Sequence, residues 1–261
     1  MKKIPQDIVG DIAILKFPRR TLWLVKRWKA GKFLRGNKSI RTVLEKTEKF
    51  SGELRTLKTK HLAGLKTKEA TYKENNCTFK FNIDETYFSP RLSNERKVIA
   101  DEVEKLTKKQ GTKILVLFAG ISPYPIVIAR KLKENKKKAK IISNELNEKA
   151  NEYGKKNIAL NKFSDYITLA EGDARRLPNK LKEKFDIILM PRPNLEDTFL
   201  DTALKLSKKG TTIFYHGFGT KDNVLEEIKR DTKNKIGKIT IRKAGDIGPH
   251  AFRWQAIFKV K

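Results

Sequence analysis

The sequence predicts an α/β protein in which a small α+β domain precedes a larger domain with a mostly parallel sheet. From Ser93 onward, apolar runs rich in Val and Ile alternate with segments of helical period, which is typical of parallel strands joined by helices. Before Pro90 no such alternation occurs. The chain has 261 residues, 38% of them hydrophobic, so a small and a medium domain can each bury a core. We place these domains at residues 1–86 and 87–261.

The first domain is expected to contain short strands around one basic helix. Leu22, Val25 and Trp28 recur at helical spacing, and two alternating segments flank a Glu-Asn-Asn turn that is typical of a hairpin. The elements expected in chain order are a strand over 7–17 that can bend at Gly10, a helix over 19–35, a short strand or extended piece over 40–46, an irregular basic segment over 53–66, and strands over 69–73 and 77–83.

The second domain is expected to begin with a helix that Ser93 caps and that ends near Lys109. The strands expected after it are 113–120, 139–144, 165–169, 185–190, 211–216, 236–243 and 251–260. The helices expected between them are 124–134, 147–161, a helix or turn over 173–183, 194–208 and 222–231. The two final strands are joined by a short connection, so one edge of the sheet is expected to be antiparallel.

Positive charge dominates the composition. Lys and Arg number 59 against 30 Asp and Glu, and the net charge of +29 favours a polyanionic partner. A lysine-rich proteome explains a twofold imbalance poorly. No apolar run reaches the length of a membrane span, and the N-terminus lacks a signal peptide, so we expect a cytoplasmic protein. Trp23 and Trp28 lie in a basic segment that fits RNA or a membrane surface. The membrane interpretation has no second anchor, so we expect the small domain over 1–86 to contact RNA. Nothing indicates an obligate protein partner.

Cysteine and histidine usage weighs against metal or thiol chemistry. Cys77 is the single cysteine and lies in an alternating segment, so we interpret it as a small packed residue. His61, His216 and His250 lack the spacing of metal ligands, and no metal is expected. We interpret His216, which ends a predicted strand, as a packed or solvated histidine and not as a catalyst.

A nucleoside-binding site is predicted at the carboxyl ends of the parallel strands, where ligands bind in such sheets. The first strand ends in a small Ala-Gly pair that lets backbone approach a ligand, and an acidic residue ends the second strand, where ribose hydroxyls are usually bound. The glycines do not fit the dinucleotide pattern, so S-adenosylmethionine suits the site better. The residues expected to bind it are Phe118, Ala119, Gly120, Glu145, Leu146, Asp173, Ala174 and Pro191.

The segments DIVGDIAIL, TYFSPRLSNER, LFAGISPYPIVIA, NELN, GDAR and DIILMPRP occur in this order. Together they resemble the archaeal and eukaryotic tRNA guanine-37 N1-methyltransferases over nearly the whole chain. The resemblance implies a Rossmann-like S-adenosylmethionine-dependent domain behind a small α+β domain. It also implies the anticodon stem-loop of tRNA as partner. Many archaeal relatives have a further N-terminal domain, which we do not expect in this chain.

The resemblance also implies roles for individual residues. The general base of the family corresponds to Glu95, and the arginine assigned to guanine O6 corresponds to Arg55. Arg96, which follows Glu95, is expected to be catalytic as well. A carboxylate can take the N1 proton while an arginine stabilises charge that develops on O6. The substrate-contacting Tyr and Arg of the same motif correspond to Tyr87 and Arg91.

One departure from the family pattern concerns the target base. The family commonly has an Asn where this chain has Pro191, and Asn194 is the nearest amide that could contact the substrate. Two alternatives on the same fold therefore stay open, both in wyosine synthesis: methylation of the tricyclic intermediate, or transfer of an aminocarboxypropyl group to it. An RNA-binding protein without catalysis is a third alternative, which the Ala-Gly turn and Glu145 disfavour.

Overall fold

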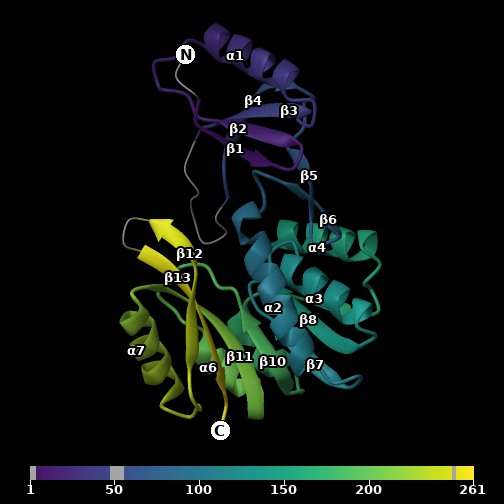
Figure 1. Ribbon diagram of the computed structural model, residues 1–261, viewed down its shortest axis with the longest axis vertical. Helices are drawn as coiled ribbons and strands as arrows, with labels where there is room; N and C mark the ends of the chain where they lie inside the picture. The colour runs from purple at the N-terminus through teal and green to yellow at the C-terminus, as the bar shows by residue number, and fades with distance from the viewer. Residues whose placement is uncertain (1–3, 48–55, 249–250) are drawn as a thin grey trace.

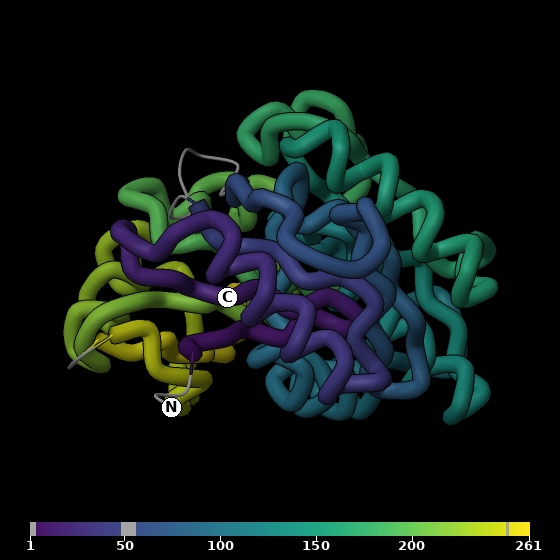
Figure 2. The backbone as a smooth tube through the Cα atoms, turned by 90° about the horizontal axis from the view of Figure 1, so that it is seen from above, coloured from purple at the N-terminus to yellow at the C-terminus, as the bar shows by residue number. Residues whose placement is uncertain are grey.

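The computed structural model describes residues 4–47, 56–248 and 251–261. A small unit with its own sheet and helix stands above a larger unit built on a second sheet (Figure 1). Seen from above, the small unit lies across the larger one, with the teal helices to one side and the yellow C-terminal strands to the other (Figure 2). The α/β architecture predicted from the sequence is confirmed.

The small sheet has the strand order β1-β2-β3-β4 and is covered on one face by a helix. Its elements are β1 (Gln6–Val9), β2 (Ile12–Leu15), α1 (Trp23–Gly36), β3 (Thr42–Lys46) and β4 (Thr59–Gly64). Strand β2 is buried on both faces: Ala13 packs with Ala30 of α1, whereas Ile12 and Ile14 belong to the cluster that also contains the core of the larger unit. The small sheet therefore lies between α1 and the rest of the molecule.

Two predictions for this unit are wrong. The expected single strand over 7–17 is an antiparallel hairpin that turns at Gly10, where φ is +58° and an added Cβ would lie 2.0 Å from the carbonyl oxygen of Thr71. The segment 53–66, expected to be irregular, contains β4. This strand pairs with β3 and buries Leu62, and pairing decides the structure despite the basic composition.

The predicted hairpin is confirmed as β5 (Glu69–Glu74) and β6 (Cys77–Asn82), whose turn residues Asn75 and Asn76 both have positive φ. It packs on the larger unit through the side-chain amide of Asn157, which donates to the carbonyl of Lys80 and accepts from its N–H. Cys77 is buried, as expected. The hairpin thus connects the two units, and the domain boundary after residue 86 stays a prediction.

The larger sheet has the order β12-β13-β11-β10-β7-β8-β9, with parallel pairs from β11 to β9 and antiparallel pairs at the β12 edge, as predicted. Its strands are β7 (Thr112–Val116), β8 (Ala139–Glu145), β9 (Ile167–Glu171), β10 (Phe185–Met190), β11 (Ser207–Gly219), β12 (Thr240–Gly248) and β13 (Ala251–Lys259). Val and Ile fill the central strands because helices cover both faces.

The helices of this unit are α2 (Ser93–Leu106), α3 (Pro123–Glu134), α4 (Glu148–Leu160), α5 (Leu177–Lys180), α6 (Leu200–Lys205) and α7 (Lys221–Thr232). The predicted helix over 194–208 is largely wrong, because residues 191–199 form a loop. Ser93 does not cap α2, since the 3₁₀ turn η1 (Pro90–Leu92) leads directly into the helix. A second 3₁₀ turn, η2 (Ala174–Arg176), precedes α5.

Candidate active site

A cavity of about 950 Å³, counted to its open mouth, lies at the carboxyl ends of β7, β8, β9 and β10. Parallel strands present their carboxyl ends at one edge of a sheet, so the turns that follow them meet there. The residues that line the cavity are Tyr87, Leu92, Phe118, Gly120, Asn144, Glu145, Leu146, Asn147, Ala150, Gly172, Asp173, Ala174, Arg175, Pro191, Arg192, Pro193, Leu195, Phe199, His216 and Arg253.

The turn after β7 brings backbone to the cavity. Phe118 and Gly120, which are predicted to bind the cofactor, have φ of +54° and +56°, and both line the cavity. Ala119, predicted to bind the cofactor, is buried behind them, and its N–H donates to the carbonyl of Asn144 at 2.8 Å. Its predicted contact with the ligand is therefore corrected to a role in fixing the turn.

Glu145 ends β8 at the cavity wall. Its carboxylate accepts hydrogen bonds from the backbone N–H groups of Gly120 at 2.7 Å and Asn147 at 2.8 Å. Burial raises the pKa of Glu145 above its ordinary value, although these backbone donors oppose the shift. The carboxylate is thereby fixed in orientation, with Leu146 beside it at the wall.

Asp173 and Ala174 also line the cavity, as predicted, at the start of η2. The Asp173 carboxylate accepts from the N–H of Arg175 at 2.9 Å, which fixes the first turn after β9. The Arg175 guanidinium lies 4.9 Å from the ring centroid of Phe199. Acidic, aromatic and apolar groups therefore meet on this side of the cavity, a mixture that suits a nucleoside.

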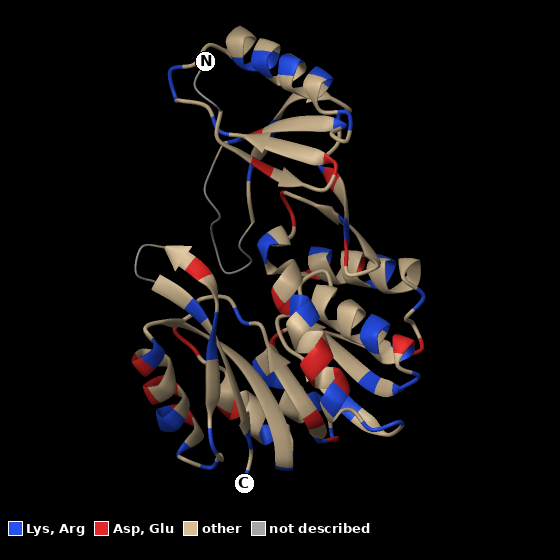
Figure 3. Cartoon of the chain, in the orientation of Figure 1, with Lys and Arg blue, Asp and Glu red and all other residues tan. Residues whose placement is uncertain are grey.

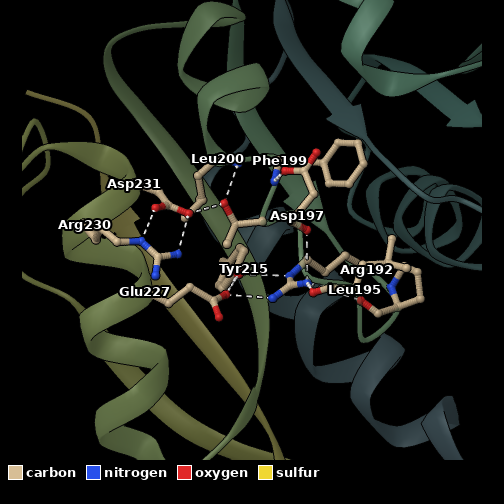
Figure 4. A network of polar contacts seen from close by, with 11 residues as sticks. Arg192, Leu195, Asp197, Phe199, Leu200, Tyr215, Glu227, Arg230 and Asp231 are labelled. Atoms are coloured by element: carbon tan, nitrogen blue, oxygen red, sulfur yellow. Dashed lines mark hydrogen bonds and ion pairs between the residues drawn. The ribbon is translucent and has the colours of Figure 1, made fainter.

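The loop over 191–199 follows β10 and forms another wall, and Arg192 holds it in place. The guanidinium is buried and donates to the carbonyls of Leu195 at 2.8 Å and Asp197 at 3.3 Å (Figure 4). It also donates to Tyr215 at 2.9 Å and to the Glu227 carboxylate of α7 at 2.7 Å. One side chain thus connects the loop to β11 and α7.

Sequence reasoning missed Arg192, although an arginine between two prolines directly after a buried strand was a signal. Pro191, predicted as a cofactor residue, does line the cavity. Asn194, predicted to contact the substrate, is exposed on the loop and is absent from the lining, so this prediction is not supported by its position.

Glu95 lies in the first turn of α2 with 5% of its surface exposed. Its two carboxylate oxygens accept from the Arg242 guanidinium of β12 at 2.8 and 2.9 Å. Nε2 of His216 lies 3.3 Å from one of them. Burial alone would raise the pKa of Glu95, but the hydrogen bonds from His216 and Arg242 outweigh it and hold the pKa below its ordinary value.

His216 connects Glu95 with the cavity. Its ring lines the cavity, whereas Glu95 does not, and burial lowers the pKa of His216 against the opposing influence of Glu95. The imidazole is therefore neutral near pH 7 and has one nitrogen lone pair. The interpretation of His216 as merely packed or solvated is incomplete, because this ring touches both the cavity and the predicted base.

Arg96, predicted to be catalytic, is placed elsewhere. Its guanidinium forms a buried ion pair with Glu74 of β5, donates to the carbonyl of Ser89 at 3.0 Å, and lies 4.9 Å from the ring centroid of Phe88. Side chains of adjacent helical residues point about 100° apart, so Glu95 and Arg96 contact different parts of the structure. The prediction is corrected: Arg96 positions the start of α2 and does not reach the cavity.

The remaining predicted site residues differ in whether they line the cavity. Tyr87 lines the cavity. Arg91 is exposed, is absent from the lining and contacts Asp7 of β1 at 3.3 Å. Arg55 lies outside the described residues, so its role stays a prediction. Arg253 of β13 lines the cavity and had no signal in the sequence.

The described residues contain neither a grouping of metal ligands nor a membrane-spanning helix. In that part of the chain, no three His, Cys, Asp or Glu side chains are grouped so as to hold a metal ion. Over the same residues, no helix is both long and apolar enough to cross a membrane.

Comparison with known proteins identifies relatives of this arrangement. The family model of the TRM5/TYW2 methyltransferase domain matches residues 70–242. The chain is 34% identical to the tRNA (guanine(37)-N(1))/4-demethylwyosine(37)-methyltransferase Taw22 of Nanoarchaeum equitans, over 95% of this chain and 96% of that protein. It is 32% identical to the tRNA (guanine(37)-N(1))-methyltransferase Trm5b of Pyrococcus abyssi, over 88% of this chain and 66% of the relative. The solved complex of aTrm5 and tRNALeu matches 99% of this chain and 72% of that chain, with a TM-score of 0.82 at 25% identity.

Proposed function

Because this chain belongs to the TRM5/TYW2 methyltransferase family, we propose that it transfers a methyl group from S-adenosylmethionine to N1 of guanosine 37 in tRNA. The comparisons confirm the predicted family, the Rossmann-like methyltransferase fold and S-adenosylmethionine as cofactor. The chain is thus an S-adenosylmethionine-dependent methyltransferase that modifies tRNA. The base that it methylates and the residues that act are the subject of the proposal.

The cavity residues fit this cofactor. Glu145 has a half-buried carboxylate fixed by two backbone donors, and an acid at this position commonly binds ribose hydroxyls. The turn with positive φ at Phe118 and Gly120 presents backbone at the same wall. We assign Asp173 to the amino group of adenine and Leu146 to its face. S-adenosylmethionine supplies an electrophilic methyl carbon to whatever base reaches the open end of the cavity.

The reaction requires a proton acceptor. N1 of guanine bears a proton, and its lone pair becomes nucleophilic as that proton leaves. The bond from N1 to the methyl carbon forms as the bond from that carbon to sulfur breaks, and sulfur keeps the electron pair. We assign proton acceptance to Glu95. Its lowered pKa keeps the carboxylate ionised, and a lone pair is available at neutral pH.

His216 gives this carboxylate a path to the cavity. A neutral imidazole can accept the N1 proton on one nitrogen and release the proton on its other nitrogen to Glu95. The 3.3 Å contact between His216 and Glu95 is the single observation on which the proposal most depends, because it joins a buried base to the cavity wall. Arg242 then stabilises Glu95 in its ionised form before reaction.

Methylation of the tricyclic intermediate 4-demethylwyosine at the same tRNA position is the second candidate. Pro191 lines the cavity and has no side-chain amide with which to recognise the guanine edge. The relative from Nanoarchaeum equitans is named for both bases. A wall of this kind suits a larger, less polar base as well as guanine.

The substrate assignment is tested with methyl-labelled cofactor and two forms of one tRNA, an unmodified transcript with guanosine at position 37 and a tRNA that carries 4-demethylwyosine there. Nucleoside analysis is expected to show 1-methylguanosine from the first. Label only in the second would select the second candidate. Label at another position, or an aminocarboxypropyl product, would overturn the proposal.

Replacing Glu95 tests the base. Glu95→Gln should lower the single-turnover methylation rate by about 10²–10⁴-fold, because the amide cannot accept the proton. Cofactor affinity, measured by calorimetry, should stay within a few-fold of wild type. Glu102→Gln, on the same helix and outside the cavity lining, is the matched control and should retain the rate. A Glu95→Gln enzyme that kept the full rate would remove Glu95 from this role.

A further inference from the structure

The segment over 12–44 is unusually cationic. It contains ten Lys and Arg and no Asp or Glu. Three of these cations have carboxylate partners: Lys16 pairs with Asp7, Lys26 with Glu45 and Arg41 with Asp11. Helix α1 occupies the middle of the segment and carries Lys and Arg (blue) but no Asp or Glu (red) (Figure 3).

The outward face of α1 combines exposed apolar groups with these cations. Leu24 and Trp28 are 78% and 56% exposed, and they alternate with exposed cations at spacings of three and four residues. We define this surface as the α1 face: Leu24, Arg27, Trp28, Lys32 and Arg35. Within the described parts of the chain, no carboxylate lies at ion-pair distance from its cations.

The inward side of α1 explains why the helix forms without burying these residues. Ala30 is fully buried against the small sheet, and Phe33 and Leu34 pack on the same cluster. The helix is therefore held by its other side, and the α1 face is not needed for folding. A tryptophan left in water loses the stabilisation of about 1.5–3 kcal/mol that burial of a large apolar side chain provides, so its exposure points to a partner.

We propose that the α1 face binds a second segment of the tRNA, away from the nucleotide held in the cavity. The inference rests on the proposed function, in which tRNA is the substrate. Phosphates complement Arg27, Lys32 and Arg35, and an unpaired base or exposed ribose edge can stack on Trp28. The nitrogen of Lys32 already lies 5.8 Å from the centroid of the Trp28 ring, so cation and aromatic surface are presented together.

The position of α1 requires an extended ligand. The small sheet separates α1 from the larger unit, whose strands carry the cavity at their carboxyl ends (Figure 1). A nucleotide in the cavity cannot also contact α1, whereas a folded tRNA can bridge both places. The charge of the α1 face favours RNA over an apolar protein partner, since this face has three cations without a carboxylate partner among the described residues and contains no acidic residue.

The test uses two triple variants with the same loss of charge. Arg27→Ser/Lys32→Ser/Arg35→Ser removes the cations of the α1 face. Lys109→Ser/Lys136→Ser/Lys138→Ser removes three exposed cations beside the ends of α2 and α3, outside the cavity lining. The first should raise the Kd for full-length tRNA at least tenfold and reduce the slope of log K against log salt by about 2–3, because each lost phosphate contact contributes about 0.7–0.9. The control variant should change both the Kd for tRNA and the salt slope by much less.

Kinetics separate this surface from the catalytic site. The α1-face variant should raise KM for tRNA while the rate at saturating tRNA and the affinity for S-adenosylmethionine stay near wild type. Trp28→Ser, which removes the aromatic surface alone, should also weaken binding of full-length tRNA.

Three outcomes would overturn the inference: equal weakening by both triple variants, unchanged tRNA binding by the α1-face variant, or binding of anionic phosphatidylserine vesicles that only this variant loses while its tRNA binding is retained. The proposed function fails separately. If the wild type binds tRNA through the α1 face but does not methylate position 37, the inference about the α1 face is supported and the proposed reaction is wrong.

Discussion

Glu95 and Arg96 are neighbours in the chain but lie in different surroundings. Glu95 is turned toward Arg242 and His216, next to the cavity, whereas Arg96 is 2% exposed and paired with Glu74. Sequence resemblance identifies both residues as one motif. It cannot divide their roles, because that depends on which strands pack on each side of α2.

Removing Arg96 should therefore affect stability more than chemistry. Arg96→Met leaves the Glu74 carboxylate buried without a partner, which typically costs about 3–5 kcal/mol. Urea unfolding should show this loss, and Arg96→Met/Glu74→Leu should recover a large part of it. At a temperature where Arg96→Met is fully folded, its single-turnover rate should be within a few-fold of wild type. An inactive variant of normal stability would restore the catalytic prediction.

The affinity for S-adenosylmethionine should depend on pH through Glu145. The ordinary pKa of a glutamate is 4.5, and burial raises that of Glu145. The ionised carboxylate accepts hydrogen bonds from the ribose hydroxyls. The affinity for S-adenosylmethionine is therefore highest at pH values above the raised pKa of Glu145, and it falls as the pH drops through that pKa. The decline should consequently begin at a higher pH than an exposed glutamate would give.

Calorimetry across pH 4.5–7 checks this expectation. Glu145→Gln should bind S-adenosylmethionine about 10–100-fold more weakly at pH 7, the loss expected for hydrogen bonds to a charged group. Its affinity should also vary little over the acidic range. A wild-type affinity that stays constant down to pH 4.5 would contradict the assignment of Glu145 to the ribose.

At the scale of elements, the buried Arg192 side chain anchors the loop over 191–199, and the Thr198 hydroxyl adds a hydrogen bond to Asp231 of α7. Arg192→Lys keeps the charge but loses the planar group that reaches Leu195, Tyr215 and Glu227 together. We expect the loop to loosen, with Kd for S-adenosylmethionine raised about tenfold by the loss of about 1.4 kcal/mol. Arg20→Lys is the control, since Arg20 is exposed on the small unit and is absent from the cavity lining. Equal effects of both substitutions would refute the role of Arg192.

Hydrophobic periodicity predicted the alternation of the larger unit because its strands are buried on both faces and its helices on one. The same reasoning failed where pairing or side-chain anchors decide the structure. Strand β4 has a basic sequence and forms because β3 pairs with it. The loop over 191–199 was predicted to be partly helical, yet its carbonyls are satisfied by Arg192 instead of a helical ladder.

At the scale of the molecule, the site is assembled from segments that no local pattern connects. The segments at the carboxyl ends of four parallel strands could be predicted from the rule for parallel sheets, and they do line the cavity. Arg242 reaches Glu95 from the antiparallel edge, and Arg253 joins from the neighbouring strand. A contact between residues so distant in the chain has no signature in a single sequence, so the partners of the base could not be predicted.

The net charge should act in opposite directions on folding and on binding. If each of the 30 acids pairs with one cation, 59 − 30 = 29 cations remain without a carboxylate partner. Their mutual repulsion destabilises the compact state, and salt screens it over a distance that shrinks from about 10 Å at 0.1 M to about 3 Å at 1 M. Buried pairs such as Arg96 with Glu74 are screened much less.

We therefore expect the midpoint of thermal unfolding to rise as NaCl increases from about 0.05 M to about 0.5 M, while the affinity for tRNA falls steeply over the same range. Scanning calorimetry and filter binding in matched buffers measure the two trends, and KCl should reproduce both. Added tRNA at low salt should raise the midpoint as well, because a bound polyanion neutralises the same charges. A midpoint that falls with salt would mean that surface ion pairs outweigh the repulsion between the excess cations.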